Sequence, residues 1–298
     1  MSFEDFGMDR RAFLAGSGVA LSALGVSGLA GCASSQEAEQ TDTHVEPVAS
    51  ADEITEDFPI GFNEDAAPMA YKDADGNYTG FDIDLIKQVC RYVGWNLVYK
   101  PLDWSTKDEA LNSGEVRCLL GGMSTEGRET DYSFTNVYMQ DFHTTAVRQD
   151  SSAAVAADLA GKVVAVQDAS STYTMLTSKW RKKDLGDSLK EIKTVSTLSE
   201  ALDLLANSEV DAVMGDDIML RYHLDAANLS STIKILDESI EASHYAFAFD
   251  LSESGPEYAS RVEYELGNLY NDGTVLADIC KKYEQYGITP ERWTLKKS

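Results

Sequence analysis

Short apolar runs alternate with amphipathic segments along the chain from about residue 58 onward, which is the pattern of an α/β protein. Residues 82–93 predict a helix, because their apolar positions recur at spacings of three and four and Gly94 follows as a stop. Residues 97–99 predict the strand after that helix. The run 163–166 is apolar throughout, which is typical of a buried parallel strand that leads into a helix.

The same alternation continues toward the C-terminus. Thr197 and Glu200 form a capping-box pair in front of apolar residues at helical spacing, so a helix is predicted to begin there. Ser105 and Asp108 have the same spacing at the start of a shorter segment. Further helices are predicted over 105–113, 254–270 and 274–286, and further extended segments over 210–214 and 245–249. Two α/β units joined by extended crossings fit this order best.

The first part of the chain has the pattern of an export signal followed by a linker. The arginine pair 10–11 resembles a twin-arginine signal, and twenty uncharged residues, 12–31, follow it. The Leu-Ala-Gly run before Cys32 resembles a bacterial lipobox. We expect residues 1–31 to be removed and Cys32 to carry lipid, with an uncleaved signal anchor as the alternative. Residues 32–57 are predicted to be a lipid anchor and disordered linker, because they contain almost no bulky apolar side chains.

Charge and composition exclude several functions. The 298 residues include 50 Asp and Glu against 25 Lys and Arg, a formal charge of −25 that becomes −24 once residues 1–31 are removed. Nucleic acids and anionic lipid surfaces would repel such a chain, so no nucleic-acid partner is expected. A hydrophobic fraction of 43% is too high for a disordered acidic chain. No later run of eighteen apolar residues exists, so the chain is not expected to form a permease by itself.

The cysteines and histidines do not indicate a metal site. Cys90, Cys118 and Cys280 all lie in apolar periodic segments, so we expect buried thiols and at most one internal disulfide. The chain has no CxxC motif, and its four histidines are far apart in sequence. No cofactor or metal is therefore expected.

A series of short motifs follows the linker in a fixed order. They are Pro68, Tyr71, Asp75-Gly76, the Gly-Phe-Asp-Ile-Asp-Leu run 80–85, Trp104, Leu111, Ser113-Gly114, the Gly-Met-Ser-Thr run 122–125, Arg128, Phe134-Thr135, Tyr138, 161–163, Gln167, Ser170-Ser171 and 211–216. Together they resemble the polar amino-acid class of bacterial solute-binding proteins, which serve ABC importers. The resemblance implies a two-lobed, type II periplasmic-binding-protein-like α/β fold, with a mixed sheet flanked by helices in each lobe and two crossing strands. The expected lobes are 58–140 with 245–298, and 141–244.

The resemblance also implies a site for one free amino acid between the lobes. Arg128 and Asp216 match the family positions that bind the carboxylate and the ammonium group of the ligand. The residue types agree with this, because a buried zwitterion needs a planar cationic fork at one end and a carboxylate at the other. The other expected ligand-binding residues are Asn63, Trp104, Gly122, Ser124, Thr125, Gln167, Ser170 and Ser171. Simpler roles stay open, namely helix capping for Asp216 and Ser170 and core packing for Trp104.

Departures from the family pattern bear on the ligand. The loop 117–128 is one residue shorter than usual, so either Met123 or Ser124 takes the hydroxyl position, and chemistry favours Ser124 because a thioether cannot donate. Asn63 stands where many members carry Asp, which disfavours a basic ligand, and Ala66 where many carry an aromatic residue. No lysine is placed to favour an acidic ligand. We therefore expect a neutral polar amino acid.

The predicted function is a binding protein without chemistry. We expect a monomer that delivers an amino acid to a membrane ABC permease and is held at the membrane by its lipid anchor. An enzyme resembling periplasmic dehydratases is one alternative, with Glu126 and His143 as the spare acid or base candidates. A free-standing amino-acid sensor is the other.

Overall fold

The computed structural model describes residues 55–179 and 181–295. The predicted signal peptide, 1–31, and Cys32 lie outside the described residues. The first strand, β1 (Glu56–Phe62), begins two residues before residue 58, where the first lobe is predicted to begin. Glu56 and Asp57 pair with residues of β5 (Trp95–Pro101), and Asn96 Nδ2 donates to Asp57 Oδ1 at 2.7 Å. Backbone pairing thus extends the strand through two charged residues that hydrophobicity alone does not mark.

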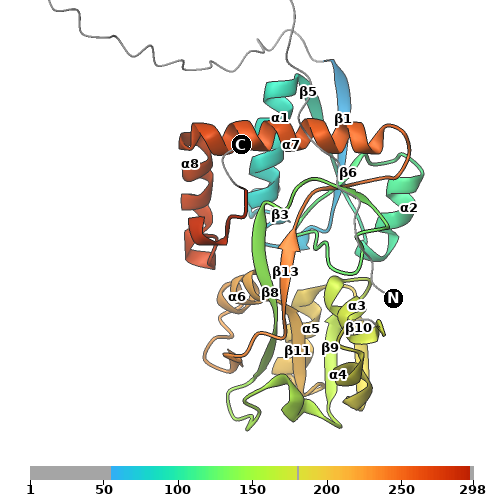
Figure 1. The fold of residues 1–298 in the computed structure, drawn as a ribbon. Coiled ribbons are helices and arrows are strands. Elements are labelled where there is room, and N and C mark those ends of the chain that lie inside the picture. The colour runs from blue at the N-terminus through green and yellow to red at the C-terminus, as the bar shows by residue number, and fades with distance from the viewer. Residues whose placement is uncertain (1–54, 180, 296–298) are drawn as a thin grey trace, which may run out of the picture. The chain divides into compact units, whose positions relative to one another are not determined.

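One sheet is built around β1 and has the strand order β5-β1-β6-β14-β7. β5 and β6 run parallel to β1, whereas β14 is antiparallel to both β6 and β7. α1 (Phe81–Val93) packs against α7 (Gly255–Asp272) and α8 (Thr274–Tyr283) beside this sheet (Figure 1). The short strands of the sheet are β6 (Cys118–Leu119), β7 (Ser133–Phe134) and β14 (Ala248–Phe249).

A second sheet has the order β10-β9-β11-β8-β12, with β13 also paired to β8. β9, β10 and β11 are parallel, and β8 is antiparallel to β11, so the sheet is mixed. The predicted apolar runs at 163–166 and 210–214 form β9 and β11. The strands are β8 (Met139–Arg148), β9 (Val163–Gln167), β10 (Glu191–Val195), β11 (Ala212–Asp216), β12 (Ile233–Ile235) and β13 (Glu241–Tyr245), and the helices are α3 (Ser171–Thr177), α4 (Lys183–Ser188), α5 (Leu198–Ala206) and α6 (Asp217–Ala226).

Short elements complete the fold. They are the three-stranded sheet β2 (Asp65–Ala66), β3 (Ala70–Lys72) and β4 (Tyr78–Thr79), helix α2 (Lys107–Asn112), and the 3-10 turns η1 (Trp104–Thr106), η2 (Ala156–Leu159), η3 (Glu284–Tyr286) and η4 (Pro290–Arg292).

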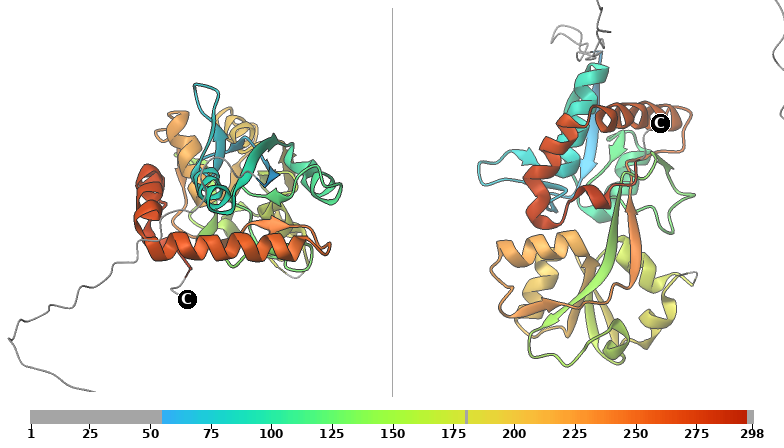
Figure 2. Two further views of the ribbon diagram at one scale, coloured as in Figure 1. Left: turned by 90° about the horizontal axis from the view of Figure 1, so that it is seen from above. Right: turned by 60° about the vertical axis from the view of Figure 1, so that its left-hand side comes forward.

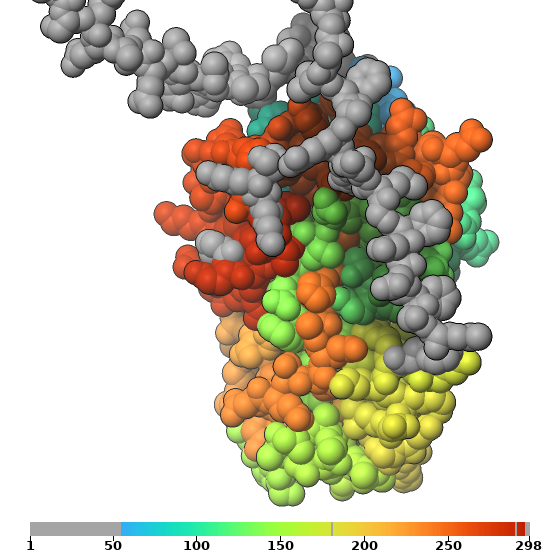
Figure 3. Space-filling model, viewed as in Figure 1, coloured from blue at the N-terminus to red at the C-terminus, as the bar shows by residue number. Residues whose placement is uncertain are grey.

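The predicted two-lobed α/β fold is confirmed. We call the β1 sheet with α1, α2, α7 and α8 the first lobe, and the β9 sheet with α3 to α6 the second lobe. β8 and β13 pair antiparallel, with Ser243 opposite Asp141, and run between the two lobes (Figures 1 and 2). In Figure 3 these strands lie side by side down the middle of the visible face. The division at residues 140/141 and 244/245 stays a prediction.

Hydrogen bonds also join the lobes away from the crossing strands. Asp65 on β2 accepts from the backbone N and the hydroxyl of Ser199 at 3.1 and 2.6 Å, and its carbonyl oxygen lies 2.9 Å from His223 Nε2. From the second lobe, Arg181 Nη1 donates to the carbonyl of Glu126 at 3.1 Å. The lobes are therefore held together on two sides by protein atoms alone.

Local chemistry explains where several helices begin and end. α1 stops at Gly94, whose φ of 81° is a left-handed conformation that glycine adopts without a Cβ penalty. Thr197 caps α5 by accepting from Glu200 N, as the capping-box pattern predicts. The predicted Ser105 cap is wrong, because Asp103 accepts from the backbone N of Ser105 and opens a 3-10 turn first.

The three described cysteines, Cys90, Cys118 and Cys280, are free and buried. Burial raises the pKa of the Cys90 thiol to about 12, so this group is protonated at neutral pH. Among the described residues no cluster of His, Cys, Asp and Glu could hold a metal ion. No helix in the described part of the chain is long and apolar enough to cross a bilayer.

Asp82 organises a turn of the first lobe. Its buried carboxylate accepts from the backbone N of Gly121 and of Gly122 at 2.9 and 2.8 Å, and from the hydroxyl of Tyr138 at 2.5 Å. Gly121 and Gly122 have φ of 102° and 73°, a region that favours glycine. Burial raises the pKa of Asp82 to about 6, although the three hydrogen bonds favour the charged form. The turn is thus held by one carboxylate that is charged at neutral pH.

Asp82→Ala is expected to lower the free energy of unfolding by about 3 to 5 kcal/mol, because three buried donors lose their acceptor. Urea unfolding at pH 7.5 measures this change. The matched control is Asp75→Ala in an exposed turn, with an expected change below about 0.5 kcal/mol. A loss below about 1 kcal/mol for Asp82→Ala would contradict the assigned role.

Candidate ligand-binding site

Residues from both lobes line one narrow cavity, with a volume of about 30 Å³. The first lobe contributes its β1 end, the Gly121-Gly122 turn and the start of the 104–112 helical segment. The second lobe contributes the ends of β9 and β11 and the helices that follow them. The lining residues are Asn63, Ala66, Trp104, Gly121, Gly122, Arg128, Gln167, Ser170, Ser171, Asp216 and Met219.

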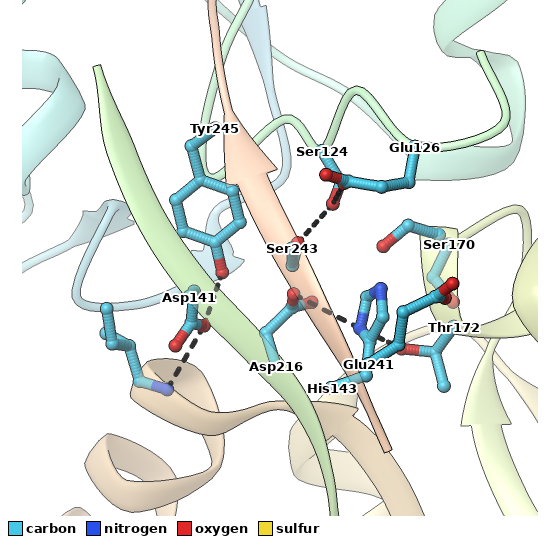
Figure 4. A network of polar contacts seen from close by, with 12 residues as sticks. Ser124, Glu126, Asp141, His143, Ser170, Thr172, Asp216, Glu241, Ser243 and Tyr245 are labelled. Atoms are coloured by element: carbon cyan, nitrogen blue, oxygen red, sulfur yellow. Dashed lines mark hydrogen bonds and ion pairs between the residues drawn. The ribbon is translucent and has the colours of Figure 1, made fainter. Parts of the chain in front are cut away.

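Eight of the ten residues predicted from the sequence line this cavity, and Ser124 and Thr125 do not. The hydroxyl of Ser124 is hydrogen-bonded to Ser243 and donates to Glu126 Oε2 at 3.2 Å (Figure 4). Thr125 opens a turn that ends at Arg128, whose backbone N donates to the Thr125 carbonyl at 3.0 Å. Both residues therefore support the loop that carries Arg128.

Arg128 is a buried cation at the boundary between the lobes. Its side chain comes from the first lobe, and Nη2 donates to the carbonyl of Ala169 in the second lobe at 2.9 Å. Nη1 lies 3.4 Å from the sulfur of Met123, so Met123, and not Ser124, is next to the guanidinium. Burial lowers the pKa of Arg128, but a guanidinium stays protonated at any physiological pH. The cavity thus has a planar cation with a carbonyl as its main acceptor.

The end of β9 brings Gln167, Ser170 and Ser171 to the cavity wall. Ser170 is the N-cap of α3, and its hydroxyl accepts from the backbone N of Tyr173 at 3.0 Å. The first backbone N–H groups of a helix have no partner inside the helix, and Ser171 is the first residue of α3. Gln167 Nε2 donates to the carbonyl of Ser196 at 3.1 Å. Ser170 therefore caps α3. This role is compatible with an anion next to the backbone N–H groups in the first turn of α3.

Asp216 ends β11 and occupies the N-cap position of α6, but its side chain makes no capping hydrogen bond. Its Oδ1 atom is buried and has no hydrogen-bond partner among the described residues. The nearest basic atom is Nδ1 of His143, at 3.6 Å (Figure 4). Asp217, which could have been the cap, instead pairs with Arg221 and Arg292. Capping therefore does not explain Asp216.

The electrostatics of Asp216 favour an incoming cation. Burial, and then the carboxylate of Asp141, raise the pKa of Asp216. His143 offers no compensating charge, because burial and the nearby cations Arg181 and Arg128 lower its pKa to about 3. A buried carboxylate without a partner is costly, so a cation placed against Oδ1 would be bound strongly.

Asn63 and Trp104 complete the first-lobe wall. Asn63 Oδ1 accepts from the backbone N of Asp65 at 2.8 Å, which fixes the amide in one orientation. Trp104 is buried in the 3-10 turn before α2. An aromatic ring and a fixed amide give the cavity one apolar and one polar surface.

Lys107 is a functional candidate that sequence reasoning missed. Its Nζ donates to the Ala169 carbonyl at 3.3 Å, the same oxygen that Arg128 contacts, and lies 5.5 Å from the Trp104 ring centroid. Burial, and then Arg128, lower its pKa. The residue is 3% exposed and does not line the cavity. Lys107 therefore lies behind the cavity wall, and the expectation that no lysine is placed to favour an acidic ligand stays a prediction.

The acid and base candidates of the enzyme alternative lie behind the cavity wall. Glu126 is hydrogen-bonded to His244 and to Ser124, and His143 Nδ1 lies 3.2 Å from the hydroxyl of Thr172. Neither Glu126 nor His143 lines the cavity. The residues that do line it suit binding of a small charged molecule between two closing lobes.

A cavity between two α/β lobes, with opposite charges from opposite lobes, defines the class of two-lobed ligand-binding proteins. The chain belongs to the bacterial extracellular solute-binding proteins, family 3, whose model matches residues 58–286. This membership supports a location outside the cytoplasm.

Individual relatives agree with the family. The chain is 27% identical over 235 residues to the probable amino-acid-binding protein YxeM of Bacillus subtilis (strain 168), which covers 78% of this chain and 86% of that protein. An ABC uptake transporter substrate-binding protein from Streptococcus pneumoniae with bound histidine has a TM-score of 0.71 and 26% identity, over 76% of this chain and 92% of that one. AncCDT-1, an ancestral amino acid-binding protein and a precursor of cyclohexadienyl dehydratase, has a TM-score of 0.66 and 25% identity, over 76% and 94%.

Lys107→Met is expected to raise the free energy of unfolding by about 1 kcal/mol at pH 7, because the variant keeps the packing and removes a buried cation beside Arg128. Since the pKa of Lys107 is lowered in the folded protein, the lysine costs stability below that pKa, and the gain should vanish as the pH rises above about 10. Thermal unfolding across pH measures both effects, with the exposed Lys190→Met as control. Destabilisation at pH 7 would contradict this reading.

Proposed function

We propose that the protein binds one free α-amino acid in the cavity between its lobes and delivers it to a membrane ABC permease. The observation that carries this proposal is the unpartnered, buried Oδ1 of Asp216 in the same cavity as the guanidinium of Arg128. The two charges come from different lobes. A molecule that carries both an ammonium and a carboxylate group would satisfy both and would stabilise the closed arrangement.

The polarity of the site follows from its chemistry. Arg128 presents a bidentate fork that suits the α-carboxylate, and the backbone N–H groups at the start of α3 add further donors near Ala169. Asp216 then takes the α-ammonium. Asn63, Trp104, Gly122, Gln167, Ser170 and Ser171 form the walls around the two ends, and Ser124 and Thr125 support the Arg128 loop.

The side chain of the ligand is proposed to be neutral and polar. Asn63 replaces a carboxylate that would favour a basic side chain, and the fixed amide offers hydrogen bonds to a polar group. Lys107 lies beside Arg128 but does not line the cavity, so an acidic side chain is the competing choice that the screen has to test. A ligand screen therefore has to include glutamate and aspartate beside glutamine, asparagine, serine and cystine.

The cellular setting is part of the proposal. Residues 1–31 would be an export signal, and Cys32 would carry the lipid that holds a monomeric protein at the membrane through the linker. No chemical step is proposed, because Glu126 and His143 are held by other side chains and do not line the cavity.

A thermal-shift screen of residues 33–298 against the common amino acids and cystine identifies the ligand, since saturation at about 100 times Kd adds about 2.7 kcal/mol. With that ligand, Arg128→Lys should weaken binding more than tenfold, because it keeps the charge and loses the fork. Asp216→Asn should cost about 2 to 5 kcal/mol of binding free energy. Calorimetry compares the free ligand with two derivatives. The N-acetyl form lacks the ammonium group and tests Asp216, and the amide form lacks the carboxylate and tests Arg128.

The substitutions Arg117→Lys and Asp225→Asn, at residues that do not line the cavity, are the matched controls and should leave Kd unchanged. If Asp216→Asn weakens the free amino acid and its N-acetyl form equally, Asp216 does not bind the ammonium. No thermal shift with any amino acid would overturn the proposed function itself.

Cys32→Ser is expected to release the protein from the membrane fraction, because only the thiol at that position can take the lipid. The parent protein should carry more than one acyl chain, since a single chain anchors only marginally. Mass spectrometry of the mature N-terminus and membrane partitioning measure both, with Ser34→Ala as control. A Cys32→Ser variant that partitions like its parent would rule out the lipid anchor.

A further inference from the structure

Arg292, near the C-terminus, contacts two carboxylates that lie next to the proposed site. It lies in η4, and its Nη2 atom donates to Asp217 Oδ2 at 2.9 Å while Nη1 pairs with Asp141 Oδ1. Asp217 is the first residue of α6 and directly follows Asp216. Asp141 is fully buried on the crossing strand β8. One cation thus serves two carboxylates that flank the proposed ammonium site.

The segment that carries Arg292 is fixed in place by the first crossing strand. The backbone N of Thr294 donates to the Tyr138 carbonyl at 3.1 Å, and its hydroxyl donates to the Val137 carbonyl at 2.6 Å. Trp293 forms a β-bridge with Met139, and its indole N–H points to the sulfur of Cys280 at 3.2 Å. The backbone after Arg292 is therefore fixed by the two residues that follow it, and the guanidinium is not a loose surface charge.

Three carboxylates share this corner, and they differ in their partners. Asp141 accepts from the hydroxyl of Tyr245 at 2.7 Å (Figure 4). It also accepts from the backbone N of Ile218 at 3.4 Å and pairs with Arg292. Asp217 has a second cation, Arg221, whose Nε lies 2.8 Å from Oδ1. Asp216 alone has no Arg or Lys within ion-pair distance among the described residues.

Buried carboxylates that lie close together compete for ionisation, and removal of a cation raises all their pKa values. The groups that act on Asp216 are Asp141, Glu126, Arg128, Tyr245 and the neutral His143. The groups that act on Asp141 are Arg292, Asp217 and Tyr245. Arg292 is the cation in direct contact with Asp141, so it decides whether Asp141 holds a charge or takes up a proton next to Asp216.

We propose that Arg292 is a positioning residue of the ammonium site: its ion pairs with Asp141 and Asp217 leave Asp216 as the carboxylate that receives the ammonium group of the ligand. This inference rests on the proposed function for the identity of the ligand group. The effect of Arg292 on the pKa values of Asp141 and Asp216 can be tested in the ligand-free protein. Arg292 does not touch the ligand and acts through the two neighbouring aspartates.

The first test uses the ligand-free protein. Carbon-13 NMR of the aspartate carboxyl groups follows the titration of Asp141 and Asp216 in the parent, Arg292→Gln, Arg292→Lys and Arg221→Gln proteins. Arg292→Gln should raise the titration midpoint of Asp141 by about one pH unit or more, and that of Asp216 in the same direction. Arg292→Lys should bring the midpoint most of the way back to that of the parent, and Arg221→Gln should move Asp141 much less than Arg292→Gln does, because Arg221 pairs with Asp217 and not with Asp141. Unchanged midpoints in Arg292→Gln would overturn the proposal.

The second test measures binding of L-glutamine by calorimetry between about pH 6 and pH 9. Asp216 has to be ionised to pair with an ammonium group, and a raised pKa keeps it neutral at low pH. Arg292→Gln should therefore weaken binding about tenfold near pH 6 and much less near pH 9, since one pKa unit corresponds to a tenfold change. An equal loss at every pH would show a merely structural role and overturn the proposal.

The two tests separate the possible failures. If neither L-glutamine nor any other amino acid binds the parent protein, the proposed function fails, and the NMR titration still decides the electrostatic role of Arg292. If L-glutamine binds and the Arg292→Gln profile matches that of the parent at all pH values, the proposed function stands and the inference about Arg292 is wrong.

Discussion

Charge placed inside a narrow cleft is the constraint on which the rest of this structure depends. A carboxylate removed from water needs donors or a cation, and the molecule provides these in different ways at different positions. Asp82 has two backbone N–H groups and a tyrosine hydroxyl, whereas Asp141 has a tyrosine and an arginine. The unsatisfied Oδ1 atom of Asp216 differs from these two carboxylates, because it has no hydrogen-bond partner among the described residues.

The elements of the fold could be predicted well from local pattern. The spacing of apolar residues in 82–93 and the following Gly94 define α1, and the apolar run at 163–166 defines β9, because burial on both faces of a sheet leaves no polar alternation. The start of the 105–113 helix was predicted wrongly, because two neighbouring residues could each cap it. Ser105 and Asp103 are both good caps, and only the 3-10 turn at Trp104 decides between them.

The site was predictable only in part, because its residues are brought together by contacts that are distant in sequence. That Arg128 and Asp216 line one cavity could be predicted from their types and from the order of motifs. Met123 and Ser124 are adjacent in one turn. Met123 contacts Arg128 because the hydroxyl of Ser124 is hydrogen-bonded to Ser243 on the crossing strand β13. Nothing in the sequence around Arg292 indicates that it reaches Asp141, 151 residues earlier.

The bonds that join Asp65 to Ser199 and His223, and Arg181 to the carbonyl of Glu126, have a kinetic consequence. All their atoms belong to the protein, so the work of breaking them is the same whatever the cavity contains. Separation of the lobes has to break these bonds before a molecule can leave. A molecule that contacts both lobes adds its own bonds to this work, so the bonds within the protein set only an upper limit on the rate of exchange.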